Sequence, residues 1–198
     1  MMTDVTERGP SKAVITILSL NVDGRLDERQ KIESINKILR LESLDFLFLQ
    51  EINISKANQI LNSFQPLYKG FVLPKSRDLI EREYIQKEYT RIKKESPNDN
   101  ETKILSKIDK SRAKASGGVA IYSHKKWMDK VKLLKEDKKL FRYIALTMQE
   151  STDEILLLIS LYGPSEGPSK SDPFFRELSA DIEEMKKGIR NEIGRAHV

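Results

Sequence analysis

The stretch Asp45–Glu51 (DFLFLQE) decides the fold. Its apolar run begins directly after Asp45, a turn-favouring residue, and leads into Gln50 and Glu51. A short apolar run bounded by a turn signal predicts a buried β-strand. This strand ends in a carboxylate where it leaves the core. Glu51 is therefore a metal ligand, a general base or a surface residue that closes the strand, and the stretch alone does not decide among the three.

The neighbouring segments alternate between strand and helix patterns. Ala13–Leu20 (AVITILSL) is rich in β-branched and aliphatic residues and ends at Asn21, just before an Asp-Gly turn. A helix is expected over Glu28–Glu42, where apolar residues recur at helical spacing. Strand, helix and strand with short connections favour an α/β layered fold. Later elements are expected as a helix over Lys56–Phe64, a strand over Tyr68–Leu73, and antiparallel neighbouring strands over Val131–Leu134, Phe141–Met148 and Glu154–Leu161.

Another helix is predicted to start with Asp172 as its N-cap and Pro173 as its first residue. It would place Phe174, Leu178, Ile182 and Met185 on one apolar face. Before the Val131 strand, Gly117 and Gly118 precede an apolar run, a pattern typical of a chain that turns sharply into a strand.

Residues 75–114 form a segment crowded with charges of both signs. We expect a helix over Asp78–Lys94, a loop at Pro97–Asn100 and a shorter helix over Glu101–Lys110. Mixed charge is typical of a solvated insertion. The alternative is a basic arm that lies on a phosphate backbone.

Composition and charge leave several function classes open and close others. The 198 residues carry a formal charge of +5, which modestly favours acidic partners such as nucleic acid. Because there is no cysteine, disulfides and cysteine-ligated zinc are excluded. The histidines, His124 and His197, are too far apart in sequence to form a metal-binding pair by spacing. The apolar run Ile155–Ile159 is too short to cross a bilayer, and we expect no membrane partner.

Four motifs occur in an order that resembles the endonuclease/exonuclease/phosphatase superfamily, most closely the endonuclease domain of long interspersed element (non-LTR) retrotransposons. The resemblance covers about residues 14–187. The motifs are LSLNVDG, LDFLFLQE, SGGVAIYS and SLYGPSEGPSKSDPFFREL.

The resemblance implies roles for three residues. Glu51 would bind a divalent cation, Mg²⁺ or alternatively Mn²⁺. Asn21 would orient the scissile phosphate or the catalytic carboxylate, and Tyr162 would act near the phosphate as a hydrogen-bond donor or proton shuttle. Without the resemblance, Asn21 is an ordinary turn residue and Tyr162 a half-buried strand end. Ser165 stands where the superfamily usually has Asn, so a phosphate contact there is in doubt.

The second half of the superfamily pattern is not found. The chain contains no Gly-Asp-x-Asn motif, and neither histidine follows an aspartate. Residues 192–198 (EIGRAHV) match what a common sequencing adapter encodes in one frame, which indicates an artificial tail. A natural helix end capped by Gly194 is the alternative.

These observations predict an α/β protein, the N-terminal part of a two-sheet β-sandwich with flanking helices. Residues 1–12 are expected to be a disordered leader and residues 13–191 an incomplete domain with 75–114 inserted. With the second sheet largely absent, apolar strands would be left uncovered. The resemblance implies Mg²⁺-dependent phosphodiester hydrolysis by a DNA endonuclease of a retrotransposon that also carries a reverse transcriptase, in an intracellular, nuclear setting. The alternatives are a phosphatase or phosphodiesterase acting on a small substrate and a non-catalytic nucleic-acid-binding module. Oligomeric state stays open.

Overall fold

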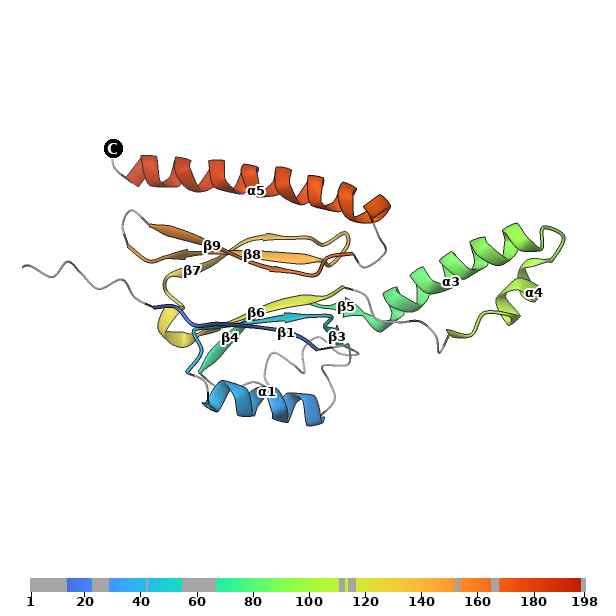
Figure 1. The fold of residues 1–198 in the computed structure, drawn as a ribbon, viewed down its shortest axis with the longest axis horizontal. Coiled ribbons are helices and arrows are strands. Elements are labelled where there is room, and N and C mark those ends of the chain that lie inside the picture. Colours follow the sequence, from blue (N-terminus) through green and yellow to red (C-terminus); the bar gives the residue numbers. More distant parts are fainter. Residues whose placement is uncertain are drawn as a thin grey trace, which may run out of the picture.

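A computed structural model describes residues 14–22, 29–41, 43–54, 67–110, 113, 117–151, 154–164 and 168–196. The chain builds four layers, in the order α1, a four-stranded sheet, a three-stranded sheet and α5 (Figure 1). The described elements are β1 (Ile17–Asn21), α1 (Arg29–Leu41), β2 (Phe46–Gln50), β3 (Asn53–Ile54), β4 (Tyr68–Leu73), β5 (Lys75–Ser76), α3 (Arg77–Glu95), α4 (Glu101–Ser106), β6 (Val119–His124), η2 (Lys125–Trp127), β7 (Val131–Glu136), β8 (Tyr143–Gln149), β9 (Ile155–Leu161) and α5 (Pro168–Ala196).

The predicted strand–helix–strand unit is confirmed as β1, α1 and β2. β1 and β2 are parallel neighbours, and the sheet continues with β6 and β4 in the order β1-β2-β6-β4. A parallel pair needs a crossover connection, which here contains α1. The described part of the expected helix, residues 29–41, is α1, and residues 28 and 42 lie outside the described residues. The helix expected over 56–64 lies outside the described residues.

The second sheet has the antiparallel order β7-β8-β9, as the sequence predicts. The expectation that this sheet is largely absent is wrong, because these three strands cover the inner face of the first sheet. Phe46 is fully buried in the layer between the sheets with Ile121, Ile144 and Leu146. The DFLFLQ strand is therefore buried against the second sheet on one face and against the α1 layer on the other.

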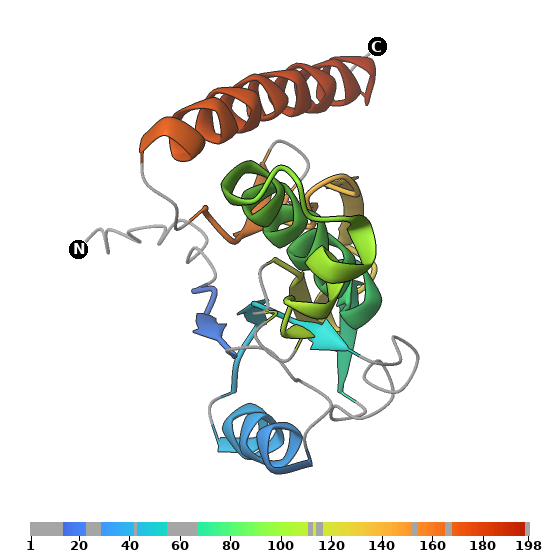
Figure 2. The ribbon, with the colours of Figure 1, turned by 90° about the vertical axis from the view of Figure 1, so that its right-hand side faces the viewer.

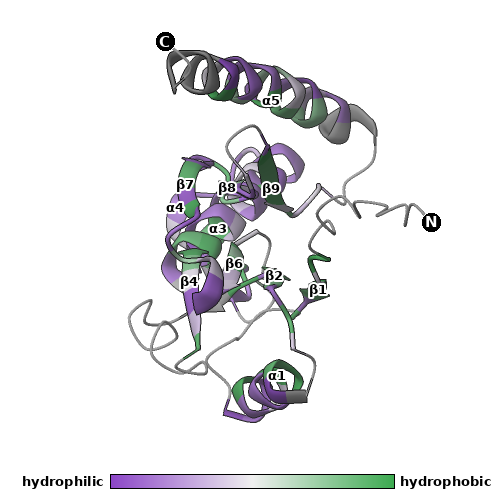
Figure 3. Cartoon of the chain, turned by 90° about the vertical axis from the view of Figure 1, so that its left-hand side faces the viewer, coloured by the Kyte–Doolittle hydropathy of each residue, from purple (hydrophilic) through white to green (hydrophobic). Residues whose placement is uncertain are grey.

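The helices α1 and α5 cover the outer faces of the two sheets. Ile35 and Leu39 of α1 are buried against Leu47 and Leu49 of β2. In Figure 3 the hydrophobic side of α1 faces the strands. On the other outer face, Phe174 and Leu178 of α5 cluster with Tyr143. The predicted apolar face of this helix is confirmed, because Phe174, Leu178 and Met185 are buried and Ile182 packs against the cluster.

The start of α5 differs from the prediction. The helix begins at Pro168, so Asp172 is not its N-cap and Pro173 lies inside it. Pro168 can take the first helical position because the N–H that proline lacks would be unpaired there. Pro173 then removes one bond near the helix start, where the loss is small compared with the apolar face that α5 buries. Gly194 also lies within the helix, so the alternative that it caps the helix is wrong.

Residues 77–108 form a helical hairpin that projects from one end of the sandwich; we call it the arm (Figures 1 and 2). The helix expected over 78–94 is confirmed as α3, whereas α4 ends at Ser106 and not at Lys110. The shorter α4 lets the chain turn, so that Ile108 joins Ile92 and Ile104 in a small core of the arm's own. No helix in the described part of the chain has the length and hydropathy needed to span a membrane.

Candidate functional site

The three predicted site residues lie at the same end of the sandwich, which we call the site end. Asn21 is the last residue of β1 and is paired in register with Gln50, the last residue of β2; Glu51 follows directly. Because β1 and β2 are parallel, their carboxyl ends share one edge. β9 ends there too: its Ser160 hydroxyl donates a hydrogen bond to the Leu49 carbonyl at 3.4 Å, two residues before Tyr162.

Glu51 has an unusual backbone conformation. It is half-buried, and its φ of 57° lies in the left-handed region that side chains other than Gly seldom adopt. The hydrogen bonds around it fix this conformation: Val22 N–H donates to the Gln50 carbonyl and Ile52 N–H to the Gly118 carbonyl, each at 3.0 Å. Strained backbone of this kind clusters at functional sites and persists where the surroundings determine it.

Gly118 joins Glu51 to the second sheet. Gly117 and Gly118 have φ values of 87° and 83°, which confirms the sharp turn that the sequence predicts at this pair. The Gly118 N–H donates to the Phe141 carbonyl at 2.6 Å, and Phe141 itself has a φ of 58°. A Cβ atom at Gly118 would lie 2.1 Å from the Ile52 carbonyl oxygen. Only glycine therefore fits between the residue after Glu51 and the start of β8.

Arg142 is a cation at the site end that sequence reasoning missed. Its guanidinium lies 5.5 Å from the Tyr162 ring centre and 5.8 Å from that of Phe174. The Tyr162 N–H donates to the Arg142 carbonyl at 2.7 Å. Cation–π contacts and this backbone bond hold the guanidinium beside Tyr162. The sequence did contain a signal for Arg142. The predicted antiparallel pairing of the Phe141–Met148 strand with the Glu154–Leu161 strand places the start of the first opposite the end of the second, next to Tyr162.

Lys75 is a second missed cation. Its side chain is only 6% exposed, and its Nζ donates to Glu83 Oε2 at 2.6 Å. The Lys75 N–H also donates to the Ile52 carbonyl at 3.4 Å, beside Glu51. Lys75 sits in a charged stretch of sequence that gives no sign of burial, so local patterns could not identify it.

The oxygen donors at the site end fit a cation that keeps most of its coordination positions for water and phosphate oxygens. Among the described residues no three His, Cys, Asp or Glu side chains gather as a metal cluster. Glu51 and Asn21 offer one carboxylate and one amide oxygen, which are hard ligands. Mg²⁺ is commonly held by one or two carboxylates together with waters and substrate phosphates. This donor set therefore fits Mg²⁺ or Mn²⁺ and does not form a closed protein cage.

His124 takes no part in this site. It ends β6 opposite Tyr68, at the other end of the sheet, and its ring meets the Tyr68 ring edge-on at 5.2 Å. Its Nδ1 accepts a hydrogen bond from the Lys126 N–H and caps η2. His197 lies outside the described residues.

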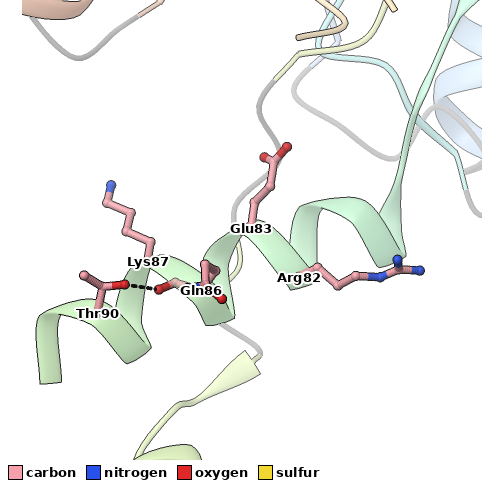
Figure 4. A pocket seen from close by; sticks show the side chains of 5 residues that line it. All are labelled: Arg82, Glu83, Gln86, Lys87 and Thr90. Carbon is pink, nitrogen blue, oxygen red and sulfur yellow. Dashed lines mark hydrogen bonds between the residues drawn. The ribbon is translucent and has the colours of Figure 1, made fainter. Parts of the chain in front are cut away.

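A shallow hollow of about 630 Å³ lies on the arm and not at the strand ends (Figure 4). Its lining residues all come from one face of α3 and are Arg82, Glu83, Gln86, Lys87 and Thr90. A hollow bounded by a single helix encloses little of a ligand. The convergence of strand ends therefore identifies the candidate site better than this hollow does.

Neither the family models nor the curated proteins contain a match to this chain. Among solved structures, the AP endonuclease LMAP from Leishmania major has 14% sequence identity and a TM-score of 0.52 over 86% of this chain and 47% of its own. A humanised D. rerio TDP2 has 14% identity and a TM-score of 0.45 over 87% of this chain and 56% of its own. The chain thus spans about half the length of each. The likeness to the AP endonuclease shows the fold alone: a two-sheet α/β sandwich like that of this enzyme.

Proposed function

We propose that this chain is part of a metal-dependent phosphodiesterase, a DNA endonuclease of a retrotransposon. The observation that carries the proposal is the convergence of Asn21, Glu51 and Tyr162, from three different strands, at one end of a nuclease-type sandwich. The retrotransposon assignment rests on the resemblance of the four sequence motifs. It implies that the protein acts on DNA in the nucleus.

Each residue at the site end has a task in this proposal. Glu51 and Asn21 would hold Mg²⁺, which when bound neutralises charge on the phosphate and activates water. Asn21 does not titrate, so its amide can donate to a phosphate oxygen at any pH. The Tyr162 hydroxyl donates a further hydrogen bond to the phosphate. The Arg142 guanidinium beside it adds a permanent positive charge suited to phosphate.

The resemblance assigns further tasks to residues that this chain does not contain. A water-positioning Asp, a phosphate-binding Asn and a His belong to the Gly-Asp-x-Asn and Asp-His motifs, which are not in the sequence. Residues that act as a unit lose nearly all activity when part of the set is missing. We therefore assign the cutting activity to a protein that includes those motifs.

The experiment that tests this function is plasmid nicking with Mg²⁺ by a protein in which the rest of the domain is restored. Glu51→Gln should keep the fold and lower the nicking rate at least about a hundredfold, because a neutral amide is a poor Mg²⁺ ligand. Glu177→Gln, which changes an exposed carboxylate on α5, is the matched control and should cut like the wild type. Near wild-type nicking by Glu51→Gln would remove Glu51 from the site.

The arm supplies the one observation in favour of a small phosphorylated substrate. Several of its cations are paired with nearby carboxylates: Arg91 binds Glu88 and Glu95, and Asp99 binds two lysines. These pairs reduce the positive charge that the arm offers to a nucleic-acid backbone. Salt separates the two functions, because affinity for DNA should fall steeply with salt and affinity for a small phosphate much less.

A further inference from the structure

The ion pair between Lys75 and Glu83 is the feature that the proposed function leaves unexplained. Lys75 is a buried lysine, and the stem of its side chain comes within 3.5 Å of where a Cβ of Gly117 would lie. Glu83 is half exposed and lies in the second turn of α3. A buried ammonium is costly unless it is paired, so Lys75 holds Glu83, and with it the root of the arm, against the site end.

Lys75 also touches the backbone that carries Glu51. It opens β5, which pairs in parallel with β3 so that Lys75 is the register partner of Asn53, two residues after Glu51. Its N–H donates to the Ile52 carbonyl, and a Cβ at Gly118 would come within 3.1 Å of the Lys75 nitrogen. Lys75 therefore lies between the arm on one side and the strained segment of Glu51 on the other.

The arm has a small core of its own. Its buried residues Ile92, Ile104 and Ile108 pack with Tyr84, Ile85 and Tyr89 and not with either core cluster of the sandwich. In Figure 1 it extends beyond the end of the two sheets. The root of the arm is held at β5, at the buried Ile80 and at the Lys75–Glu83 pair, and β5 and this pair adjoin the segment Glu51–Asn53.

We propose that Lys75 is a positioning residue that couples the arm to the metal-binding carboxylate. Through Glu83 it fixes the root of the arm, and through Ile52 and Asn53 it fixes the backbone conformation in which Glu51 presents its side chain. This inference rests on the proposed function, since it takes Glu51 to be a metal ligand.

The test is an Mn²⁺ titration of the ¹⁵N-labelled 198-residue chain followed by NMR. Paramagnetic broadening reports even weak binding, and it should affect the amides of Asn21 and Ile52 first. Lys75→Met keeps the apolar stem and removes the charge, and Glu83→Gln removes the partner. Each should weaken Mn²⁺ binding at this site about three- to tenfold, and the double variant should be no weaker than the singles, because both remove the same link.

Two controls separate positioning from general damage. Arg91→Gln breaks the ion pairs farther out on the arm, and Asp45→Asn destabilises the opposite end of the sandwich; both should leave Mn²⁺ binding unchanged. If Lys75→Met does not fold, Glu83→Gln, on the exposed side of the pair, carries the test alone.

The outcomes distinguish the two proposals. If Glu51→Gln abolishes Mn²⁺ broadening while the Lys75 and Glu83 variants bind like the wild type, the coupling is overturned and the proposed function stands. If Glu51→Gln also binds Mn²⁺ like the wild type, Glu51 is not the ligand, and both proposals fall. Weakening by Asp45→Asn equal to that by Glu83→Gln would also overturn the coupling, because general destabilisation would then explain the effect.

Discussion

Gly118 is a residue at which adding a single methyl group should strongly lower the stability of the fold. Gly118→Ala would place a methyl group 2.1 Å from a backbone oxygen, at a φ of 83° that L-residues rarely adopt. We expect a loss of roughly 3 kcal/mol in the free energy of unfolding, measured in urea. Gly188→Ala is the matched control: it lies in α5 with open space around it and should add about 1 kcal/mol. Equal stability of Gly118→Ala and the wild type would contradict the described packing.

Asp45, which the sequence marks only as a turn boundary, stabilises the start of β2, at the opposite end of the strand from Glu51. Its buried carboxylate accepts hydrogen bonds from the Thr16 N–H at 2.8 Å and Trp127 Nε1 at 2.7 Å and pairs with Lys126. Burial alone would raise the pKa of Asp45. The hydrogen bonds from Lys126, Thr16 and Trp127 outweigh it, so the pKa of Asp45 lies below its ordinary value.

This lowered pKa predicts how stability changes with acid. A carboxylate with a depressed folded-state pKa stabilises the fold above its unfolded pKa of about 3.9, and that stability is lost as the pH falls through the folded pKa. Asp45→Asn should lower the free energy of unfolding by roughly 2 kcal/mol at pH 7. Between about pH 5 and pH 2 the free energy of unfolding of this variant should fall less steeply than that of the wild type. Urea unfolding at several pH values measures both; parallel curves for variant and wild type would refute the assignment.

The site could be predicted from sequence where a residue directly follows an apolar run. Asn21 and Tyr162 directly follow such a run and Glu51 follows one after Gln50, and the parallel pairing of β1 with β2 brings Asn21 and Glu51 to one edge. Lys75 could not be found this way, because its burial depends on Gly117 and Glu83, which lie far from it in the chain or across a helix turn. The roles of Asn21, Glu51 and Tyr162 in metal and phosphate binding remain predictions.

At the scale of elements, strands and long helices follow from local pattern and helix ends do not. β4 has the bounds that the sequence predicts, and α3 differs by one residue at each end. The predicted start of α5 is wrong because Pro168 and Pro173 both suit a first helical position, and the local pattern does not select between them. The early end of α4 likewise reflects tertiary contacts of Ile108.

The arm should behave as a solvated element in DNA binding. Arg91 is occupied by Glu88 and Glu95, and Lys93 donates to the carbonyls of Pro97 and Asp99. Reversing the charges of Arg91, Lys93 and Lys94 should therefore leave both the DNA affinity and its salt dependence unchanged, as measured by fluorescence anisotropy. Arg142→Gln, at the site end, should weaken binding in the same assay. Weaker binding with a flatter salt slope in the arm variant would instead make the arm a backbone contact.

For the whole molecule, we expect the 198-residue chain to bind DNA weakly and to cut nothing. Its second sheet packs on the first, but β1 remains an edge strand on which Ile17 is 46% exposed. Exposed edge strands promote pairing with other chains, so any aggregation of the 198-residue chain should involve edge strands such as β1. Plasmid nicking with Mg²⁺ and purified chain is the measurement, with Glu51→Ala as the control. Metal-dependent nicking that disappears in Glu51→Ala would mean that these residues already contain a complete site.

The pairing of β4 with β6 has a consequence for how this architecture can vary. Leu73 and Val119 are antiparallel register partners, so the polypeptide leaves the sheet and returns to it at adjacent points. The arm is thus an expansion of what would otherwise be a β-hairpin turn. Because the entropy of closing a loop grows only with the logarithm of its length, such a turn tolerates large changes in size. Natural relatives could lengthen or lose it, and a reporter domain could be grafted there, without changing the register of any strand.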